Sequence, residues 1–129
     1  MEEYLHKDLT SLIIHCFYKV YNQLGFGFLE KVYENALKHE LEKHGLVVER
    51  QKGIKVYYDS LVVGEYFADL IVNNAVILEL KACESICAEH EHQLINYLKA
   101  TDIKLGLLLN FGKKAEIKRK IFDICILFL

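Results

Sequence analysis

The spacing of apolar residues changes at Gly45, and this change restricts the folds open to the sequence. Before Gly45, apolar side chains recur every three or four residues, as on one face of an α-helix. After Gly45, Val, Ile, Tyr and Phe gather in short segments separated by turn residues, which is typical of β-strands. The sequence therefore predicts an α+β fold in which helices precede a sheet.

Three helices and five or six strands are expected. The helices cover about residues 9–24, 28–44 and 85–100. Turn pairs divide the β-region: Lys52-Gly53, Asp59-Ser60 and Asn73-Asn74. The strands they leave are 46–50, 54–58, 61–72, 75–81 and 104–110, while 116–122 fits either a strand or a short helix.

The third helix decides how the last strands join the sheet. As a crossover between Lys81 and Lys104, it lets the strand after it lie parallel to the strand before it. The other neighbours are expected to be antiparallel. We therefore predict one domain over residues 1–129, with a tendency to three layers and with helices packed on a mixed, mostly antiparallel sheet.

Composition limits the setting and the partners. The chain of 129 residues is 53% apolar, so it can bury a core without a disulfide or a metal. No signal peptide is apparent, and no apolar run approaches the roughly 20 residues needed to span a bilayer, so we expect a cytoplasmic protein and no membrane partner. With a net charge of −2, a nucleic acid would have to be held by a local basic patch.

The four cysteines are expected to be reduced and to act as small buried hydrophobic residues. Two of them lie near two histidines, in the order Cys83, Cys87, His90 and His92. A zinc site usually needs closely spaced ligand pairs separated by a loop, and this spacing does not provide them. Structural roles are therefore preferred to a metal site here.

Charged residues inside apolar strands indicate where chemistry could occur. Asp69 lies in YFADLIV, and Glu79 and Lys81 lie in AVILELKA. Burying such charges is costly unless they are paired or bind a metal. Glu79 and Lys81 are two residues apart and therefore leave the same face of a strand. Two carboxylates beside an ammonium group suit a hard cation such as Mg²⁺, although a plain cross-strand ion pair between Asp69 and Lys81 is the simpler alternative.

The metal hypothesis depends on the hairpin between the two acidic strands. With Asn73-Asn74 as a two-residue loop, Asp69 would lie opposite Leu78, on the wrong face from Glu79. The carboxylates can share a face only if the loop holds three residues or a strand carries a bulge.

Polar residues on the predicted helices are further candidates for the functional site. Glu30 lies on the same side of the second helix as Tyr33, and Gln93 and Tyr97 are one turn apart on the third helix. Read singly, Glu30 is as readily a solvated residue or a partner of the helix dipole, and the two tyrosines are ordinary core aromatics.

Together these residues resemble a known pattern. Asp69 with Glu79-Leu80-Lys81 is similar to the signature of the PD-(D/E)XK nuclease superfamily, and Gln93 to Tyr97 resembles the Q-x-x-x-Y motif of its exonuclease-like branch. The segment from Gly27 to Tyr33 matches the motif that names the GxxExxY proteins. Further similar stretches are VYENAL, ERQ, VGEYFADLIV, HEHQLINYLKAT and GLLLNFG, so that the resemblance covers about residues 9–122. The chain departs from that family at Tyr21, where histidine is usual, and at Phe26, where proline is usual.

The resemblance implies a restriction-endonuclease-like core and a Mg²⁺- or Mn²⁺-dependent nuclease. Asp69, Glu79 and Glu30 would be the metal ligands and Lys81 the catalytic lysine. Gln93 and Tyr97 would support the site or contact the scissile strand. His90 also falls at a family-like position, without an implied role.

Three functions remain open at this stage. The first is hydrolysis of phosphodiester bonds in DNA, or in RNA. The second is a non-catalytic nucleic-acid-binding protein or accessory subunit, and the third is an interaction domain in which the charged residues form only an ion-pair network. A nucleic acid would most readily meet the basic residues Lys113, Lys114, Lys118, Arg119 and Lys120, with a weaker set at Arg50, Lys52 and Lys55. The apolar end ICILFL is expected to be buried in the fold or in a homodimer interface.

Overall fold

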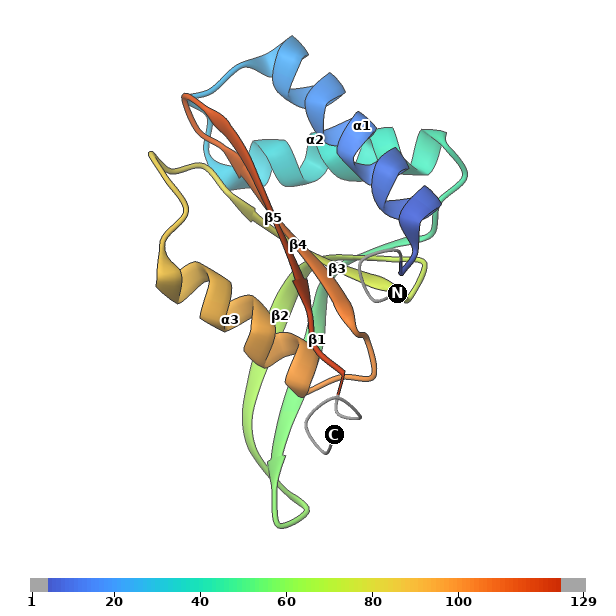
Figure 1. Cartoon of the computed structure of the whole chain (residues 1–129), viewed down its shortest axis with the longest axis vertical. Helices are drawn as coiled ribbons and strands as arrows, with labels where there is room; N and C mark the ends of the chain where they lie inside the picture. Colours follow the sequence, from blue (N-terminus) through green and yellow to red (C-terminus); the bar gives the residue numbers. More distant parts are fainter. Residues whose placement is uncertain (1–4, 124–129) are drawn as a thin grey trace.

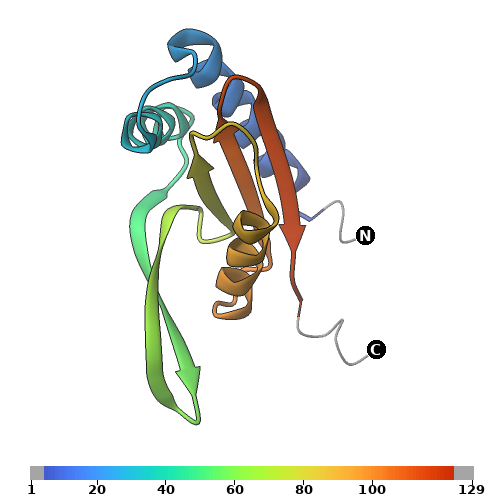
Figure 2. The ribbon, with the colours of Figure 1, turned by 90° about the vertical axis from the view of Figure 1, so that its left-hand side faces the viewer.

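The apolar stripes before Gly45 form two helices that cover one face of a five-stranded sheet. The computed structural model describes residues 5–123. The helices are α1 (Lys7–Leu24) and α2 (Glu30–Lys43), and a third, α3 (Ala88–Lys99), covers the opposite face. The result is the α+β fold with three layers that the sequence predicts (Figures 1 and 2).

The sheet follows chain order. Its strands are β1 (Val48–Tyr58), β2 (Leu61–Val72), β3 (Val76–Lys81), β4 (Leu105–Phe111) and β5 (Ala115–Ile121). Only β3 and β4 are parallel, and α3 is the crossover between them. The remaining neighbours are antiparallel, so the predicted mixed, mostly antiparallel sheet is confirmed.

Two hydrophobic clusters hold the layers together, one on each face. The alternation of side chains along β3 divides its residues between them, because Leu78 and Leu80 face α1 and α2 while Ile77 faces α3. On the α3 face, Leu94 and Leu98 of the helix are completely or almost completely buried against the sheet. Glu79 and Lys81 have the parity of Ile77, so both belong to the α3 face.

The predicted turn at Lys52-Gly53 is wrong. β1 and β2 form one long hairpin that extends away from α1 and α2, and within it Gly53 pairs with Phe67 in the ladder (Figure 2). Pairing with the long β2 keeps β1 extended at Gly53, although glycine disfavours strand structure. Close to this position, Gln51 has a φ of 51° and no partner in the ladder, and a second irregularity shifts the register between Val56 and Tyr57.

The connection between β2 and β3 meets the condition set by the sequence. Leu70 pairs with Leu78 and Val72 with Val76, so the connection holds three residues, Asn73 to Ala75. Continuing this register places Asp69 opposite Glu79.

The remaining segments resolve the open predictions. Residues 115–121 form a strand, antiparallel to β4, in place of the alternative short helix. No helix within residues 5–123 is long and apolar enough to cross a bilayer. The apolar stretch 124–129, on which the homodimer expectation rests, lies outside the described residues and includes Cys125.

Candidate active site

Asp69 and Glu79 meet where the β2–β3 ladder gives way to side-chain hydrogen bonds. The backbone N–H of Asp69 donates to Glu79 Oε1 at 3.1 Å, and the backbone N–H of Leu80 donates to Asp69 Oδ2 at 2.8 Å. Each carboxylate is therefore held by the neighbouring strand. The two acidic groups are fixed side by side by the backbone itself, which limits their movement.

The pair is electrostatically unusual, because Glu79 is only 5% exposed. Burial, with a further contribution from the negative charge of Asp69, raises the pKa of Glu79 to about 9. The hydrogen bond from the Asp69 backbone and the positive charge of Lys81 act in the opposite direction. The site thus disfavours two negative charges unless a cation accompanies them.

Lys81 ends β3 on the same face as Glu79 and is half-buried. Its ammonium group forms no salt bridge with any carboxylate in the described part of the chain. Its charge lowers the pKa values of Glu79 and of the Cys83 thiol against larger opposing effects of burial. An unpaired cation therefore stands beside the two carboxylates.

Glu34 and Gln51 extend this cluster toward α2, and the motif analysis did not select either as a site residue. The amide of Gln51 donates to Glu34 Oε1 at 2.7 Å and to Asp69 Oδ1 at 3.3 Å. Glu34 is 4% exposed and also contacts Lys31 and Arg50. The only signals in the sequence were the helical spacing of Glu30 and Glu34 and the ERQ segment, whereas the unusual φ of Gln51 leaves no signature.

Glu30 is not joined to this cluster. It is exposed in the first turn of α2, and no hydrogen bond or ion pair links it to another described residue. Burial is the main effect that raises the pKa of the Cys83 thiol, and the negative charge of Glu30 makes a small further contribution. The structure therefore places Glu30 toward the segment that follows β3, not in contact with Asp69 or Glu79.

Tyr33 has a structural role that accounts for the end of the Gly27–Tyr33 motif. It is fully buried and stacks on Phe111, with a ring-centroid distance of 4.3 Å. Its hydroxyl donates to the Gly25 carbonyl at 2.6 Å and accepts from the Phe28 N–H at 3.2 Å. These bonds fix the loop between α1 and α2, and so the start of α2 where Glu30 lies.

The α3 residues differ in their surroundings. Tyr97 is buried, and burial raises its pKa to about 12, with smaller contributions from the charges of Glu79 and Asp69. Gln93, one turn earlier, is exposed. His90 Nδ1 accepts a hydrogen bond from the backbone N–H of Cys87 at the helix start, which gives His90 a capping role.

Sequence comparison decides the family to which this arrangement belongs. The profile of the PD-(D/E)XK nuclease superfamily matches residues 7–120. The chain belongs to the PD-(D/E)XK nuclease superfamily.

Structural comparison supports the fold of this superfamily member. The crystal structure of SSO0001 is similar to it, with a TM-score of 0.52 and 15% sequence identity, over 74% of this chain and 52% of the other. The chain thus spans about half the length of that protein. A search of curated proteins finds no significant match.

The acidic cluster of this superfamily member suits a divalent cation. Its donors are hard carboxylate oxygens, which Mg²⁺ and Mn²⁺ prefer. A bound cation would also offset the two effects that raise the pKa of Glu79, namely its burial and, second, the negative charge of Asp69. Asp69 and Glu79 are therefore the residues that could hold such an ion, whereas Glu30 makes no contact with either of them in the described structure.

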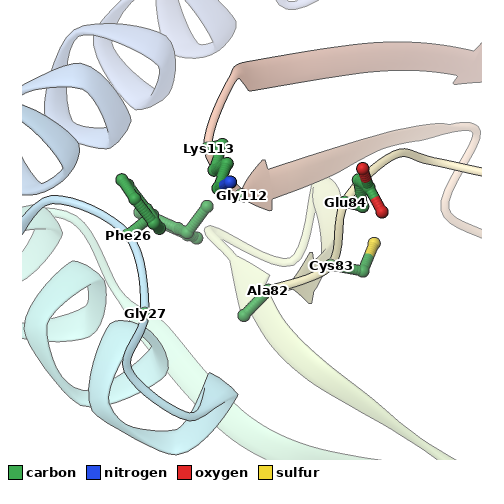
Figure 3. Close-up of a pocket in the computed structure, with 8 residues that line it drawn as sticks. Phe26, Gly27, Ala82, Cys83, Glu84, Gly112 and Lys113 are labelled. Atoms are coloured by element: carbon green, nitrogen blue, oxygen red, sulfur yellow. The ribbon is translucent and has the colours of Figure 1, made fainter.

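A hollow of about 290 Å³ lies beside the end of β3. Figure 3 shows Phe26, Ala82 and Lys113 around it, contributed by three different connections. Asn110 stabilises this region, because its side chain bonds both the N–H and the carbonyl of Cys83 at 3.0 Å. The segment that follows Lys81 is thereby held against β4.

The five basic residues near the C-terminus do not form one surface. Arg119 turns toward α1, where it donates to the Leu5 carbonyl at 2.9 Å. Lys120 pairs with Glu91 of α3. Lys113, Lys114 and Lys118 are exposed, but Lys118 lies on the strand and the other two lie in the turn before it. The predicted single patch is thus divided because successive strand residues point to opposite faces.

The cysteine predictions are borne out in part. Cys16, Cys83 and Cys87 are free thiols, as expected. Cys16 is buried, but Cys87 is exposed, so the expectation of uniform burial is wrong. Within the described residues, Cys83, Cys87, His90 and His92 do not converge into a group able to hold a metal.

Proposed function

We propose that this protein is a metal-dependent nuclease that hydrolyses phosphodiester bonds, with DNA as the first substrate to test and RNA as the second. The observation that carries the proposal is the fixed pair of Asp69 and Glu79 with the unpaired ammonium group of Lys81 on the same face. Membership of a nuclease superfamily supports it.

The residues have distinct parts in the proposed reaction. Asp69 and Glu79 hold the divalent ion, which supplies positive charge where negative charge develops on the phosphate. Lys81 donates hydrogen bonds to the attacked phosphate or to the incoming water and stabilises the developing charge. Gln51 keeps the Asp69 carboxylate oriented through its hydrogen bond.

The chemical balance of the step is simple. A water oxygen adds to phosphorus, and the bond from phosphorus to one ester oxygen breaks. The attacking water gives up a proton and the leaving oxygen takes one up. The products are one chain end with a phosphate monoester and one with a hydroxyl group.

Cleavage of labelled DNA and RNA, with Mg²⁺, Mn²⁺ or EDTA, tests the proposal. We expect cleavage that EDTA abolishes, and a loss of about 100-fold or more in Glu79→Gln and in Lys81→Ala. Lys38→Ala is the matched control, because Lys38 pairs with Glu42 within α2. Cleavage that survives both Glu79→Gln and Lys81→Ala would contradict the assignment, and binding without any cleavage would favour the accessory-subunit alternative.

A further inference from the structure

We infer that the groove between the β1–β2 hairpin and α3 binds a single-stranded segment of polynucleotide beside the Asp69–Glu79 pair. The inference rests on the proposed function and adds a class of substrate to it, namely strands with unpaired bases.

The groove is defined by two elements that approach each other only in the folded chain. It has a volume of about 440 Å³ and is lined by Lys55, Val56, Tyr57, Tyr66, Asn96, Lys99 and Ala100. Gly64 is the ladder partner of Val56 and adds no side chain to this face. The volume lies within the range of about 300–1,000 Å³ that is typical of ligand sites.

The lining chemistry matches a single strand. Tyr57 and Tyr66 are 61% and 50% exposed, so their rings are open for stacking. A base can stack on an aromatic ring only when its face is free, and pairing in a duplex leaves the faces stacked on other bases. The groove therefore distinguishes unpaired from paired nucleotides.

Two lysines supply the charge that a phosphate backbone needs. Within the described residues Lys55 forms no ion pair, and the ammonium group of Lys99 lies 5.7 Å from the centre of the Phe122 ring, without a carboxylate partner. One lysine comes from each wall of the groove. Phosphates between them would neutralise both, and Asn96 adds an amide for hydrogen bonding.

The groove leads to the acidic pair through the aromatic residues. The rings of Tyr66 and Tyr97 lie 5.7 Å apart, between centroids. Tyr97 in turn packs in the cluster that contains Ala68 and Ile77, which are near neighbours of Asp69 and Glu79 in the strands. A strand that stacks on Tyr66 would thus continue toward the proposed reaction centre.

A second copy of this chain is the competing occupant, because the hairpin beyond the groove also exposes Tyr58, Leu61, Val62 and Val63. Charge favours the polynucleotide. A symmetric dimer through this face would bring the lysines of both copies together, whereas a phosphate chain offers them the opposite charge.

Fluorescence anisotropy with labelled oligonucleotides in EDTA tests the inference without any cleavage. The probes are oligothymidylate, oligouridylate and a duplex of equal length, so that DNA, RNA and pairing are compared separately. We expect single strands to bind more tightly than the duplex, and Tyr66→Ala and the double variant Lys55→Gln/Lys99→Gln each to weaken binding about tenfold or more. The exposed Tyr18 and the partly buried Lys38, which pairs with Glu42, provide the controls Tyr18→Ala and Lys38→Gln.

The outcomes separate this inference from the proposed function. Equal binding by the wild type and both groove variants, or tighter binding of the duplex, would overturn the inference even if cleavage is observed. A dimer in sedimentation that Tyr66→Ala dissociates, with unchanged oligonucleotide binding, would assign the face to a second copy. Single-strand binding lost in the groove variants, in a protein that cleaves nothing, would support the inference while the proposed function fails.

Discussion

At the scale of single residues, Glu79 is the group whose charge depends most on its surroundings. Its pKa of about 9 in the metal-free fold lies far above its value of 4.5 in an unfolded chain. The folded state therefore binds a proton more tightly than the unfolded state. The stability that this proton confers is complete below pH 4.5 and is lost as pH rises toward 9.

We predict that metal-free protein becomes less stable as pH rises between about 5 and 9, and that Glu79→Gln reduces this dependence. The contribution of Glu79 to the slope is at most about 1.4 kcal/mol per pH unit. Urea denaturation in EDTA at several pH values measures it. Parallel pH profiles for the two proteins would show that Glu79 is ionised in the fold at neutral pH.

Residue-scale prediction from sequence succeeded for groups that break a pattern. A charge in an apolar strand is visible without a structure, so Asp69, Glu79 and Lys81 could be selected. The shared face of Glu79 and Lys81 followed from their spacing, whereas that of Asp69 depended on the length of the hairpin loop. Glu34 and Gln51 escaped selection because glutamate on a helix and glutamine in a strand are ordinary. Their importance arises from a hydrogen-bonded link between α2 and β2 that only the fold creates.

At the scale of elements, the segment after β3 depends on a close approach by the β4–β5 turn. A Cβ added at Gly112 would lie 2.1 Å from the Cys83 carbonyl oxygen, a backbone atom that cannot move aside alone. The contact explains why glycine follows β4. It also joins two connections that flank the hollow shown in Figure 3.

We predict that Gly112→Ala destabilises the protein by about 1–3 kcal/mol, because the clash forces a backbone shift. Gly64→Ala is the matched control, since its Cβ would meet nothing closer than Tyr66 at 3.9 Å. Chemical denaturation of the two variants gives the comparison. Equal stability of Gly112→Ala and Gly64→Ala would contradict the close packing of this turn.

The order and type of the elements followed from the sequence, and the errors have a common cause. The stripes of α1 and α2 and the turns at Asp59 and Asn73 are local signals, so they were read correctly. The false turn at Lys52-Gly53 is also a local signal, but pairing with β2 overrides it. Residues 116–122 were ambiguous because only pairing with β4 settles their conformation.

At the scale of the whole molecule, the charge balance limits how strongly a polynucleotide can be held. The chain carries a net charge of −2. Several basic residues are already engaged, since Lys52 pairs with Glu49, Arg50 with Glu34 and Lys120 with Glu91. The overall field therefore does not attract a polyanion, and the few unpaired lysines must hold it locally.

We predict a shallow dependence of single-strand binding on salt. Two phosphate contacts, at Lys55 and Lys99, give a slope of about −1.4 for the logarithm of the binding constant against the logarithm of salt concentration. Anisotropy titrations at several NaCl concentrations measure this slope. A slope several times steeper would mean that further lysines, such as the exposed Lys113 and Lys118, also contact phosphates.

The three-residue connection between β2 and β3 has a consequence for how this protein can vary. Surface turns usually accept inserted or deleted residues. Here the pairing of Val72 with Val76 across Asn73 to Ala75 sets Asp69 opposite Glu79, and a slip of one residue in that pairing would set Asp69 against Leu78, on the other face of the sheet from Glu79. The strand register at this turn is therefore part of the specification of the acidic pair, and a change that slipped the pairing by one residue would remove the site while leaving each of its residues in the sequence.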